Sequence, residues 1–323
     1  MDWIRDADID PAALSGKRVA IIGYGNQGRA QALNLRDSGA EVAIGLREGS
    51  ASQAEAEREQ LTVLSLAAAA AWADVTMMLA PDEHHAAIYG EIAQSLREGS
   101  ALGFSHGLSV RFGLISPRYD LDVFLIAPKG PGTALRSLYL DGKGMIAAWA
   151  VAQDASGRAR DIALAYGGAI GSGRAGLIAT SFAEEAEADL FNEQAVVWGA
   201  VPELLIAGYE TLVDGGCSPE LAYLECVGEL KLLADLIEAR GIAGMREAIS
   251  NTAELGALLG GRRIVDNGVR QRMADILAEV RAGKFAAALT AEAGAGYPAL
   301  NAERRENLSS EIENTRRRLK PAS

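Results

Sequence analysis

The stretch RVAIIGYGNQG, residues 18–28, decides the fold of the first half of this chain. It reads as a short apolar β-strand that runs into a Gly-x-Gly-x-x-Gly turn and then into the helical pattern NQGRAQALNL. Glycines at such a turn let backbone N–H groups approach a pyrophosphate at the helix N-terminus. Outside this context the glycines would indicate an ordinary strand–helix turn. Here they predict a dinucleotide site, whose expected cofactor-binding residues in the turn are Gly23, Tyr24, Gly25, Asn26, Gln27 and Gly28.

The rhythm of this stretch repeats along the first half of the chain. Short apolar runs that end in Gly, Pro or a polar group recur as EVAIGLR, DVTMMLAPDE, SALGFSHG and DVFLIAPKG, and MIAAWAV near 145–151 is a further strand candidate. Alternating strands and helices predict a parallel sheet covered on both faces. From about Ser181 onward, long helical periodicity replaces the strand pattern.

We therefore predict an α/β protein with two domains. Residues 1–180 form a Rossmann-like, doubly wound domain, and residues 181–323 form an all-helical domain. The tail from about residue 306 is charge-rich and is expected to be a solvated helix or disordered.

Composition narrows the class of protein. Of the 323 residues, 49% are apolar and 23% charged, and the net charge of −12 argues against nucleic acid or an anionic membrane as the main partner. Cys217 and Cys226 lack the CxxC spacing of a zinc site or a disulfide framework. The polar N-terminus is unlike a signal peptide, and we read no apolar run of the roughly 18 residues that a membrane span needs. A cytoplasmic protein is expected.

The second predicted strand, EVAIGLREGSAS, bears on the choice of nucleotide. An NAD enzyme places Asp or Glu at the end of this strand to bind the ribose 2′-OH. This chain has Arg47 there, followed by Ser50 and Ser52. A guanidinium and two hydroxyls suit a 2′-phosphate, which an acid would repel. The alternative is a solvated arginine in a polar loop. We predict NADP(H).

Three other strand-end loops should open into the same crevice, because ligands bind beyond the carboxyl ends of parallel strands. They are APDEHH, FSHG and APKGPG, and they hold all three histidines of the chain. A single histidine is more often structural, but His106 at a strand end beside a nucleotide site is a candidate for function. The residues of these loops expected to line the site are Asp82, Glu83, His84, His85, His106, Lys129 and Gly132.

The acidic run EEAEADLFNEQ, residues 184–194, divides by helical phase. At about 100° per residue, Asp189 and Glu193 fall within the apolar stripe begun by Phe182, whereas Glu184, Glu185 and Glu187 fall outside it and are expected to be solvated. The helix that starts at Ser218 repeats the pattern: Glu225 and Glu229 share a face with several leucines.

Four inward carboxylates need a compensating charge, because burying them unpaired costs several kcal/mol each and they raise one another's pKa. Two divalent cations bound by oxygen ligands, as in di-metal carboxylate bundles, would supply it, and oxygen-only ligation favours Mg²⁺ or Mn²⁺. The alternative is that these faces are partly solvated or paired with Lys and Arg.

Taken in order, GYGNQG, GLREGSAS, PDEHH, SHG, IAPKGPG, EADLFNEQ, LECVGELKL and AISNTAELG resemble the short-form (class I) ketol-acid reductoisomerases, over about Lys17 to Arg305. The resemblance implies a Mg²⁺-dependent alkyl shift in 2-acetolactate or 2-aceto-2-hydroxybutyrate. NADPH then reduces the product to a 2,3-dihydroxy acid, a step in valine and isoleucine synthesis. It also implies a knotted helical domain and a homodimer or larger homo-oligomer whose active site is shared between subunits.

Carried over motif by motif, the resemblance assigns roles to particular residues. Two Mg²⁺ would be bound by Asp189 and Glu193 with Glu225 and Glu229 from the partner, and Glu229 would carry a proton. Ser250 would hold the substrate carboxylate, and His106 and Lys129 would line the reaction site.

The chain departs from the family pattern at Arg29, Gly130, Thr133 and Asn192, which leaves the substrate range open. A paralogue acting on a related 2-keto acid, a metal-independent NADP-dependent hydroxyacid dehydrogenase and a catalytically dead NADP-binding sensor are the alternatives. The dehydrogenase gives no reason for four inward acids. A dead sensor would be expected to have lost at least one metal acid or Lys129, and this chain retains them all.

Overall fold

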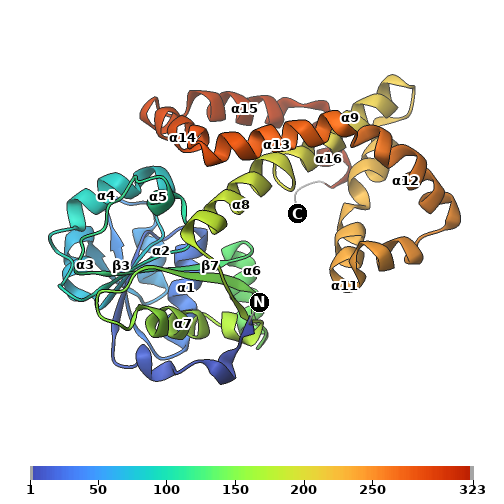
Figure 1. Ribbon diagram of the computed structural model, residues 1–323. Helices are drawn as coiled ribbons and strands as arrows, with labels where there is room; N and C mark the ends of the chain where they lie inside the picture. Colours follow the sequence, from blue (N-terminus) through green and yellow to red (C-terminus); the bar gives the residue numbers. More distant parts are fainter. Residues whose placement is uncertain (1–2, 321–323) are drawn as a thin grey trace. The chain divides into compact units, whose positions relative to one another are not determined.

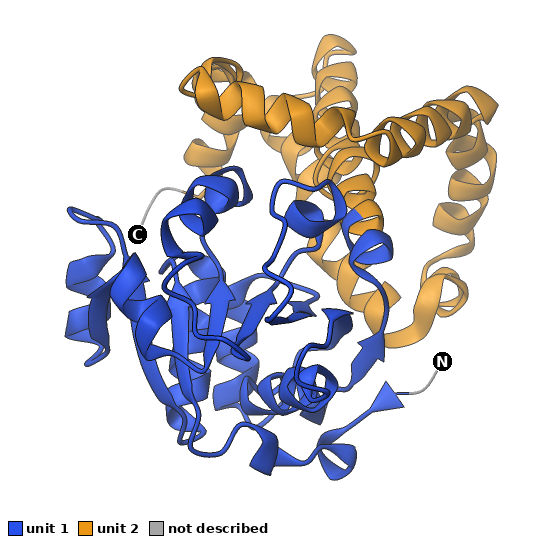
Figure 2. Ribbon diagram, turned by 60° about the vertical axis from the view of Figure 1, so that its left-hand side comes forward, with its two compact units in different colours: residues 1–186 blue, residues 187–323 orange. Residues whose placement is uncertain are grey.

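The computed structural model describes residues 3–320, which divide into two compact units, residues 1–186 and 187–323 (Figure 2). The division falls inside helix α8 (Phe182–Ala195), a few residues beyond the boundary predicted near residue 180. The described part of the first unit is α/β, and that of the second is all-helical (Figure 1), as the sequence predicts.

The first unit is built on one nine-stranded sheet in the order β1-β9-β8-β7-β6-β5-β2-β3-β4. All neighbouring strands are parallel except for two antiparallel pairs, β7 with β8 and β1 with β9. The strands are β1 (Trp3–Ile4), β2 (Arg18–Ile22), β3 (Glu41–Leu46), β4 (Thr62–Ser65), β5 (Val75–Met78), β6 (Ala101–Phe104), β7 (Asp122–Pro128), β8 (Ala147–Gln153) and β9 (Leu177–Ala179).

Helices cover both faces of this sheet, and each face has its own core. Successive residues of β2 show this, because Val19 and Ile21 belong to one buried cluster whereas Ala20 and Ile22 belong to the other. The first cluster contains residues of α1, α6 and α7, and the second contains residues of α3 and α4. The helices are α1 (Asn26–Asp37), α2 (Gln53–Arg58), α3 (Leu66–Trp72), α4 (His85–Ile92), α5 (Leu108–Arg111), α6 (Gly132–Leu140) and α7 (Ala159–Ala169).

The second unit consists of helices throughout its described residues, 187–320. After α8 these are α9 (Ala200–Asp214), α10 (Pro219–Tyr223), the π-helical turn η5 (Leu224–Gly228), α11 (Leu230–Ala248), α12 (Asn251–Ile264), α13 (Asn267–Arg281), α14 (Lys284–Gly294), α15 (Pro298–Ser309) and α16 (Glu311–Leu319). The tail is therefore helical up to Leu319, and it is anchored: Thr315 is fully buried, 2.8 Å from the hydroxyl of Tyr209.

Several helices of the second unit bury little within this chain. Neither α11 nor α12 contains a buried residue. The stretch Phe182–Asp214 is apolar and long enough to cross a membrane by length and composition, which differs from our reading of the sequence. Only 6% of its most apolar window is buried, and the structure breaks it into α8 and α9 around a turn at residues 196–199. Large apolar side chains of α9, α11 and α12, among them Leu204, Leu232 and Leu259, are therefore exposed within the chain.

Candidate cofactor and active site

The glycine-rich turn has the form that a strand–turn–helix cofactor site requires. Gly23 has φ +97°, and a Cβ there would lie 2.8 Å from backbone atoms of Ala80. A Cβ on Gly28 would collide with the carbonyl oxygen of Gly23. At Gly25, by contrast, a Cβ would meet no atom of the described residues within 4 Å. Two glycines are therefore required by the packing of the protein, and the third keeps open the space in front of α1.

A cavity of 460 Å³ lies at this turn, at the carboxyl ends of β2, β3 and β5. Its volume is within the range of small-molecule sites. It brings together the turn, the loop after β3 and the loop after β5, whereas the predicted loops after β6 and β7 do not line it. Its lining includes the predicted residues Gly23, Tyr24, Gly25, Asn26, Gln27, Arg47, Ser50, Ser52 and His84, and no Asp or Glu.

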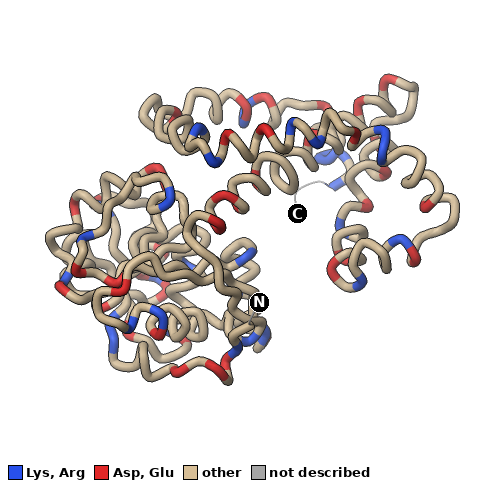
Figure 3. Tube along the Cα trace, in the orientation of Figure 1, with Lys and Arg blue, Asp and Glu red and all other residues tan. Residues whose placement is uncertain are grey.

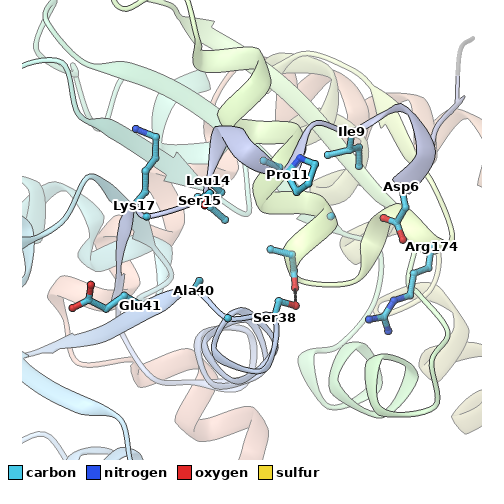
Figure 4. Close-up of a pocket in the computed structure, with 15 residues that line it drawn as sticks. Asp6, Ile9, Pro11, Leu14, Ser15, Lys17, Ser38, Ala40, Glu41 and Arg174 are labelled. Atoms are coloured by element: carbon cyan, nitrogen blue, oxygen red, sulfur yellow. Dashed lines mark hydrogen bonds between the residues drawn. The ribbon is translucent and has the colours of Figure 1, made fainter.

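A second, slightly larger cavity of 530 Å³ lies elsewhere in the same unit (Figure 4). Its lining includes Lys17, which precedes β2, and Glu41, the first residue of β3. It also includes Ser38, which donates a hydrogen bond to the carbonyl of Ala169 at 2.7 Å. It therefore borders the amino ends of the strands and contains no predicted site residue. We place the site at the carboxyl edge, where parallel sheets bind ligands.

Arg29 and Arg47 have different surroundings, which matters for an anionic ligand. Arg29 donates to Glu59 from Nε at 3.0 Å and again from its terminal nitrogen, and Tyr24 donates to the same carboxylate at 2.5 Å. Burial and the bond to Glu59 raise the pKa of Tyr24. The charge of Arg29 is thus already compensated by Glu59, with Glu55 at 3.4 Å. Arg47 is the arginine that lines the 460 Å³ cavity.

The loop after β5 differs from prediction at His85. This histidine is buried, and its Nε2–H donates to the carbonyl of Ala80 at 2.8 Å, so Nδ1 accepts from the hydroxyl of Ser109 at 2.8 Å. Burial lowers its pKa, which keeps the ring neutral. We correct our expectation of a cofactor contact: both ring nitrogens bind the protein, and His85 holds the loop in place.

Asp82 and His106, from different loops, lie together. His106 Nδ1 is 3.4 Å from an oxygen of Asp82. Burial alone would raise the pKa of Asp82, but the hydrogen bond and charge of His106 lower it. Of the predicted residues of these loops, His84 lines the 460 Å³ cavity, and Asp82, Glu83, His85, His106, Lys129 and Gly132 do not. Gly132 opens α6 beside Asn26, and a Cβ there would collide with the Asn26 carbonyl.

Lys129 has a partner that the sequence did not predict. Its Nζ lies 2.6 Å from Oε1 of Glu185, whose other oxygen accepts the N–H of Gly107 at 2.8 Å. Glu185 is 4% exposed, so our prediction that it is solvated was wrong. A Cβ on Gly107 would collide with the carbonyl of Phe182, which shows how closely the first turn of α8 packs on this loop. The sequence did carry a signal for this pair: Lys129 follows a buried strand, and a charge in such a position needs an opposite charge nearby.

The other acids of α8 are visible in Figure 3. Glu184 is exposed, as expected, and accepts from the Thr180 hydroxyl at 2.8 Å. Glu187, also expected to be solvated, is only 17% exposed and pairs with Arg281 at 2.9 Å. Asp189 is half-buried and Glu193 is exposed. The sequence prediction that both face a core is therefore correct only in part for Asp189 and wrong for Glu193.

The second predicted pair differs more. Glu225 and Glu229 are both exposed, so they do not face a core of this chain, contrary to prediction. The sequence predicted one α-helix here, but Leu224–Gly228 forms a π-helical turn, a feature common at functional sites. Among residues 3–320, no three His, Cys, Asp or Glu side chains converge as a metal site. Ser250 is exposed and caps α12 by accepting the N–H of Ala253 at 3.2 Å.

Comparison with known proteins gives a consistent result over the whole chain. Residues 13–176 match the family model "Acetohydroxy acid isomeroreductase, NADPH-binding domain", and residues 182–323 match "Ketol-acid reductoisomerase, C-terminal domain". The chain is similar to an NADH-preferring ketol-acid reductoisomerase from an uncultured archaeon, with 41% identity, a TM-score of 0.96 and coverage of 99% of this chain and 98% of that one.

More distant likenesses show the fold alone. A semialdehyde dehydrogenase NAD-binding protein from Cupriavidus necator is 19% identical with a TM-score of 0.62, over 82% of this chain and 98% of that one. A pyrroline carboxylate reductase from Plasmodium falciparum is 12% identical with a TM-score of 0.53, over 83% of this chain and 98% of that one.

Proposed function

The chain belongs to the ketol-acid reductoisomerase family and carries out that reaction in branched-chain amino-acid biosynthesis, and we propose that it does so with NADPH, two Mg²⁺ and a site shared between subunits. The observation that carries the cofactor choice is the lining of the 460 Å³ cavity, which has Arg47, Ser50 and Ser52 and no acid. The preference for NADH is a property of the archaeal relative and does not transfer without the residues that cause it.

NADPH differs from NADH by one phosphate on the adenosine ribose. A guanidinium binds phosphate through fixed, paired donors, and serine hydroxyls add further donors at low steric cost. An enzyme that selects NADH uses an acid at this strand end to accept from the 2′-OH and to repel the phosphate. This chain places a cation there instead. Arg29, which Glu59 already neutralises, contributes little to that choice.

For the metals, the donor set fits Mg²⁺. Asp189 and Glu193 of one subunit, with Glu225 and Glu229 of its partner, offer only carboxylate oxygens, the ligands that hard divalent cations take. When bound, the metals would act as Lewis acids toward the oxygens of the ketol acid. The exposure of Glu193, Glu225 and Glu229 in the single chain agrees with a site completed by a second copy.

The surface of the helical unit supports such a second copy. Large apolar side chains of α11 and α12 are exposed within the chain, among them Leu232 at 63% and Leu259 at 63%. Contiguous apolar faces of this kind are covered by a partner in stable oligomers. We propose a homodimer as the smallest active unit. The family consists of soluble metabolic enzymes, and we propose a cytoplasmic location.

Around the reacting carbons, the described residues have distinct tasks. Lys129, held by Glu185, places a cation at the end of β7, where it can stabilise negative charge on a substrate oxygen. His106 is held beside Asp82 at the end of β6. Ser250, at the N-terminus of α12, would bind the substrate carboxylate, and Glu229 would move the proton. Gly130 and Thr133 border this region and bear on the preferred acyl group.

The experiment that tests the proposal is NADPH oxidation with 2-acetolactate, with and without Mg²⁺. We expect turnover that requires Mg²⁺ and that is faster with NADPH than with NADH. Turnover that survives exhaustive treatment with EDTA would contradict the metal assignment. In a second arm, Asp189→Asn is expected to abolish turnover and leave NADPH binding nearly intact. A collapse of NADPH affinity in this variant would show that the acid serves the cofactor and not the metal.

A further inference from the structure

A chain of hydrogen bonds between two buried and two half-buried side chains runs beneath the glycine-rich helix. It starts at Tyr166 of α7, whose hydroxyl donates to Oε1 of Gln31 at 2.7 Å. The Nε2 of Gln31 then donates to Oε1 of Gln27 at 3.1 Å and to Oγ of Ser105 at 3.0 Å. Gln31 and Tyr166 are both fully buried. The amide group of Gln31 is therefore the branch point between α1, α7 and the loop after β6.

Both branches end on backbone carbonyls of the β7 segment. Gln27 donates to the carbonyl of Gly130 at 2.9 Å, and Ser105 donates to the carbonyl of Ile126 at 2.8 Å. A carbonyl can only accept, so every donor in the chain must point away from Tyr166. Burial holds the pKa of Tyr166 well above its ordinary value, which keeps its hydroxyl a donor. The direction of the network is thus fixed, and such one-way chains strengthen their members.

Two members of the network are adjacent in sequence to the two residues given tasks in the reaction. Ser105 immediately precedes His106, and Gly130 immediately follows Lys129. Gln27, which connects Gln31 to Gly130, belongs to the glycine-rich turn and lines the cofactor cavity. A buried amide is a costly way to fill space between a helix and a sheet, since an apolar side chain of the same size avoids the desolvation penalty. The position of Gln31, between the cofactor turn and the two loops, suggests why a buried amide is used here.

We propose that Gln31, oriented by Tyr166, is a positioning residue that fixes the His106 and Lys129 loops relative to the cofactor turn. The inference rests on the proposed function, because it takes these two loops to be the ones that meet the substrate. Gln31 is hydrogen-bonded to neither His106 nor Lys129. It acts on their loops through Ser105 and Gln27. Misplacement of reacting groups by about 1 Å can reduce a rate by about 100-fold, so loss of this network should appear in kcat.

The test compares Gln31→Met and Tyr166→Phe with a matched control on the same helix. Asn34→Leu also removes a fully buried amide from α1, but Asn34 bonds to the carbonyl of Ile170 at 2.9 Å and to Arg136 at 2.9 Å, away from the cofactor cavity. For each variant, kcat and KM with 2-acetolactate, the Kd of NADPH and amide hydrogen exchange of residues 105–107 and 129–132 are measured.

We expect both network variants to lose about 10- to 100-fold in kcat while the Kd of NADPH changes by less than about threefold. Exchange in the two loops should accelerate in them and not in Asn34→Leu, which should keep its kcat. Because the residues form one chain, the double variant should lose no more than Gln31→Met alone.

Two results would overturn the inference. One is a kcat within about twofold of wild type in both network variants, since a misplaced loop must slow the reaction. The other is an equal loss in Asn34→Leu, which would reduce the effect to general destabilisation of α1. If the wild-type enzyme itself fails to turn over 2-acetolactate, the proposed function is wrong, and loop exchange alone then decides whether the network positions these loops.

Discussion

Replacing Arg47 by aspartate should reverse the cofactor preference of this enzyme. The change is a clean perturbation, because Arg47 is exposed and its side chain makes no hydrogen bond or ion pair among residues 3–320. The backbone carbonyl of Arg47 accepts the N–H of Ser50 at 3.1 Å, a bond that aspartate can also make. The folded state should therefore lose less than about 0.5 kcal/mol, which is usual for surface substitutions. The substitution should therefore change the affinity for the nucleotide and leave stability almost unaltered.

The magnitude follows from the bonds that would be lost. A hydrogen bond to a charged group contributes about 1.5–3 kcal/mol, or about 10- to 150-fold in affinity. The new carboxylate adds repulsion toward the 2′-phosphate, so the Kd of NADPH should rise by about 100-fold or more. Toward NADH the same carboxylate can accept from the ribose 2′-OH, so the Kd of NADH should stay constant or fall.

The assay is titration of both nucleotides, followed by kcat/KM with each. Arg58→Asp is the matched control, because it makes the same change in charge on the neighbouring helix α2 but does not line the 460 Å³ cavity. In the wild-type enzyme, added salt should raise the Kd of NADPH more than the Kd of NADH. If Arg47→Asp and Arg58→Asp shift NADPH affinity equally, the effect is one of net charge and the assignment of Arg47 to the 2′-phosphate fails.

Three further changes test other parts of the structure. Glu185→Ala removes the acceptor of the Gly107 N–H and of Lys129, and should lower the free energy of unfolding by about 2–4 kcal/mol after allowing for the partial exposure of Lys129. Glu185→Gln should lower it less. Denaturant unfolding that finds no difference between Glu185→Ala and wild type would contradict the buried pair. Burial lowers the pKa of His85 in the folded state, so below about pH 6.5 the unfolded chain binds a proton that the folded chain does not. The free energy of unfolding should therefore decrease as the pH is lowered, by up to about 1.4 kcal/mol per pH unit. In unfolding measurements, His85→Gln should reduce this slope. Leu259→Glu should shift the enzyme toward monomer in light scattering. Leu140→Glu should not, because Leu140 is similarly exposed, at 65% against 63%, but lies in the first unit.

The sheet was readable from the sequence wherever strands are buried on both faces. β2, β5 and β6 are buried at every residue except Arg18 and are mostly apolar, because helices cover both faces of the sheet, and such runs are distinctive. β4 was not predicted, because its four residues are half-buried or exposed. β1 and β9 were not predicted either, because strands of two or three residues are too short to show an alternation of apolar and polar residues. Local pattern also gives no pairing direction, so the antiparallel partners β7 and β8 could not be told from parallel ones.

The site was predictable where chemistry follows directly from the end of a strand. The turn at Gly23 and the cation at Arg47 each follow a strand that the pattern defines, and the structure brings both into one cavity. The role of His85 was not predictable in this way, because its bonds to Ala80 and Ser109 depend on how the chain folds back after β5. A histidine in such a loop looks the same in sequence whether its ring faces the cofactor or the core.

The acidic helix shows why helical phase alone assigns burial poorly. A helical wheel assumes that one stripe faces one core along the whole helix, but α8 begins in the first unit and continues in the second. Glu185, Asp189 and Glu193 lie four residues apart and so form one slowly winding row, which the wheel had split into a solvated flank and a buried centre. In the structure the exposure rises along this row, from Glu185 at 4% through half-buried Asp189 to exposed Glu193. The salt bridge to Lys129 neutralises Glu185, the first acid of the row, and so lowers the repulsion that Glu185 exerts on Asp189.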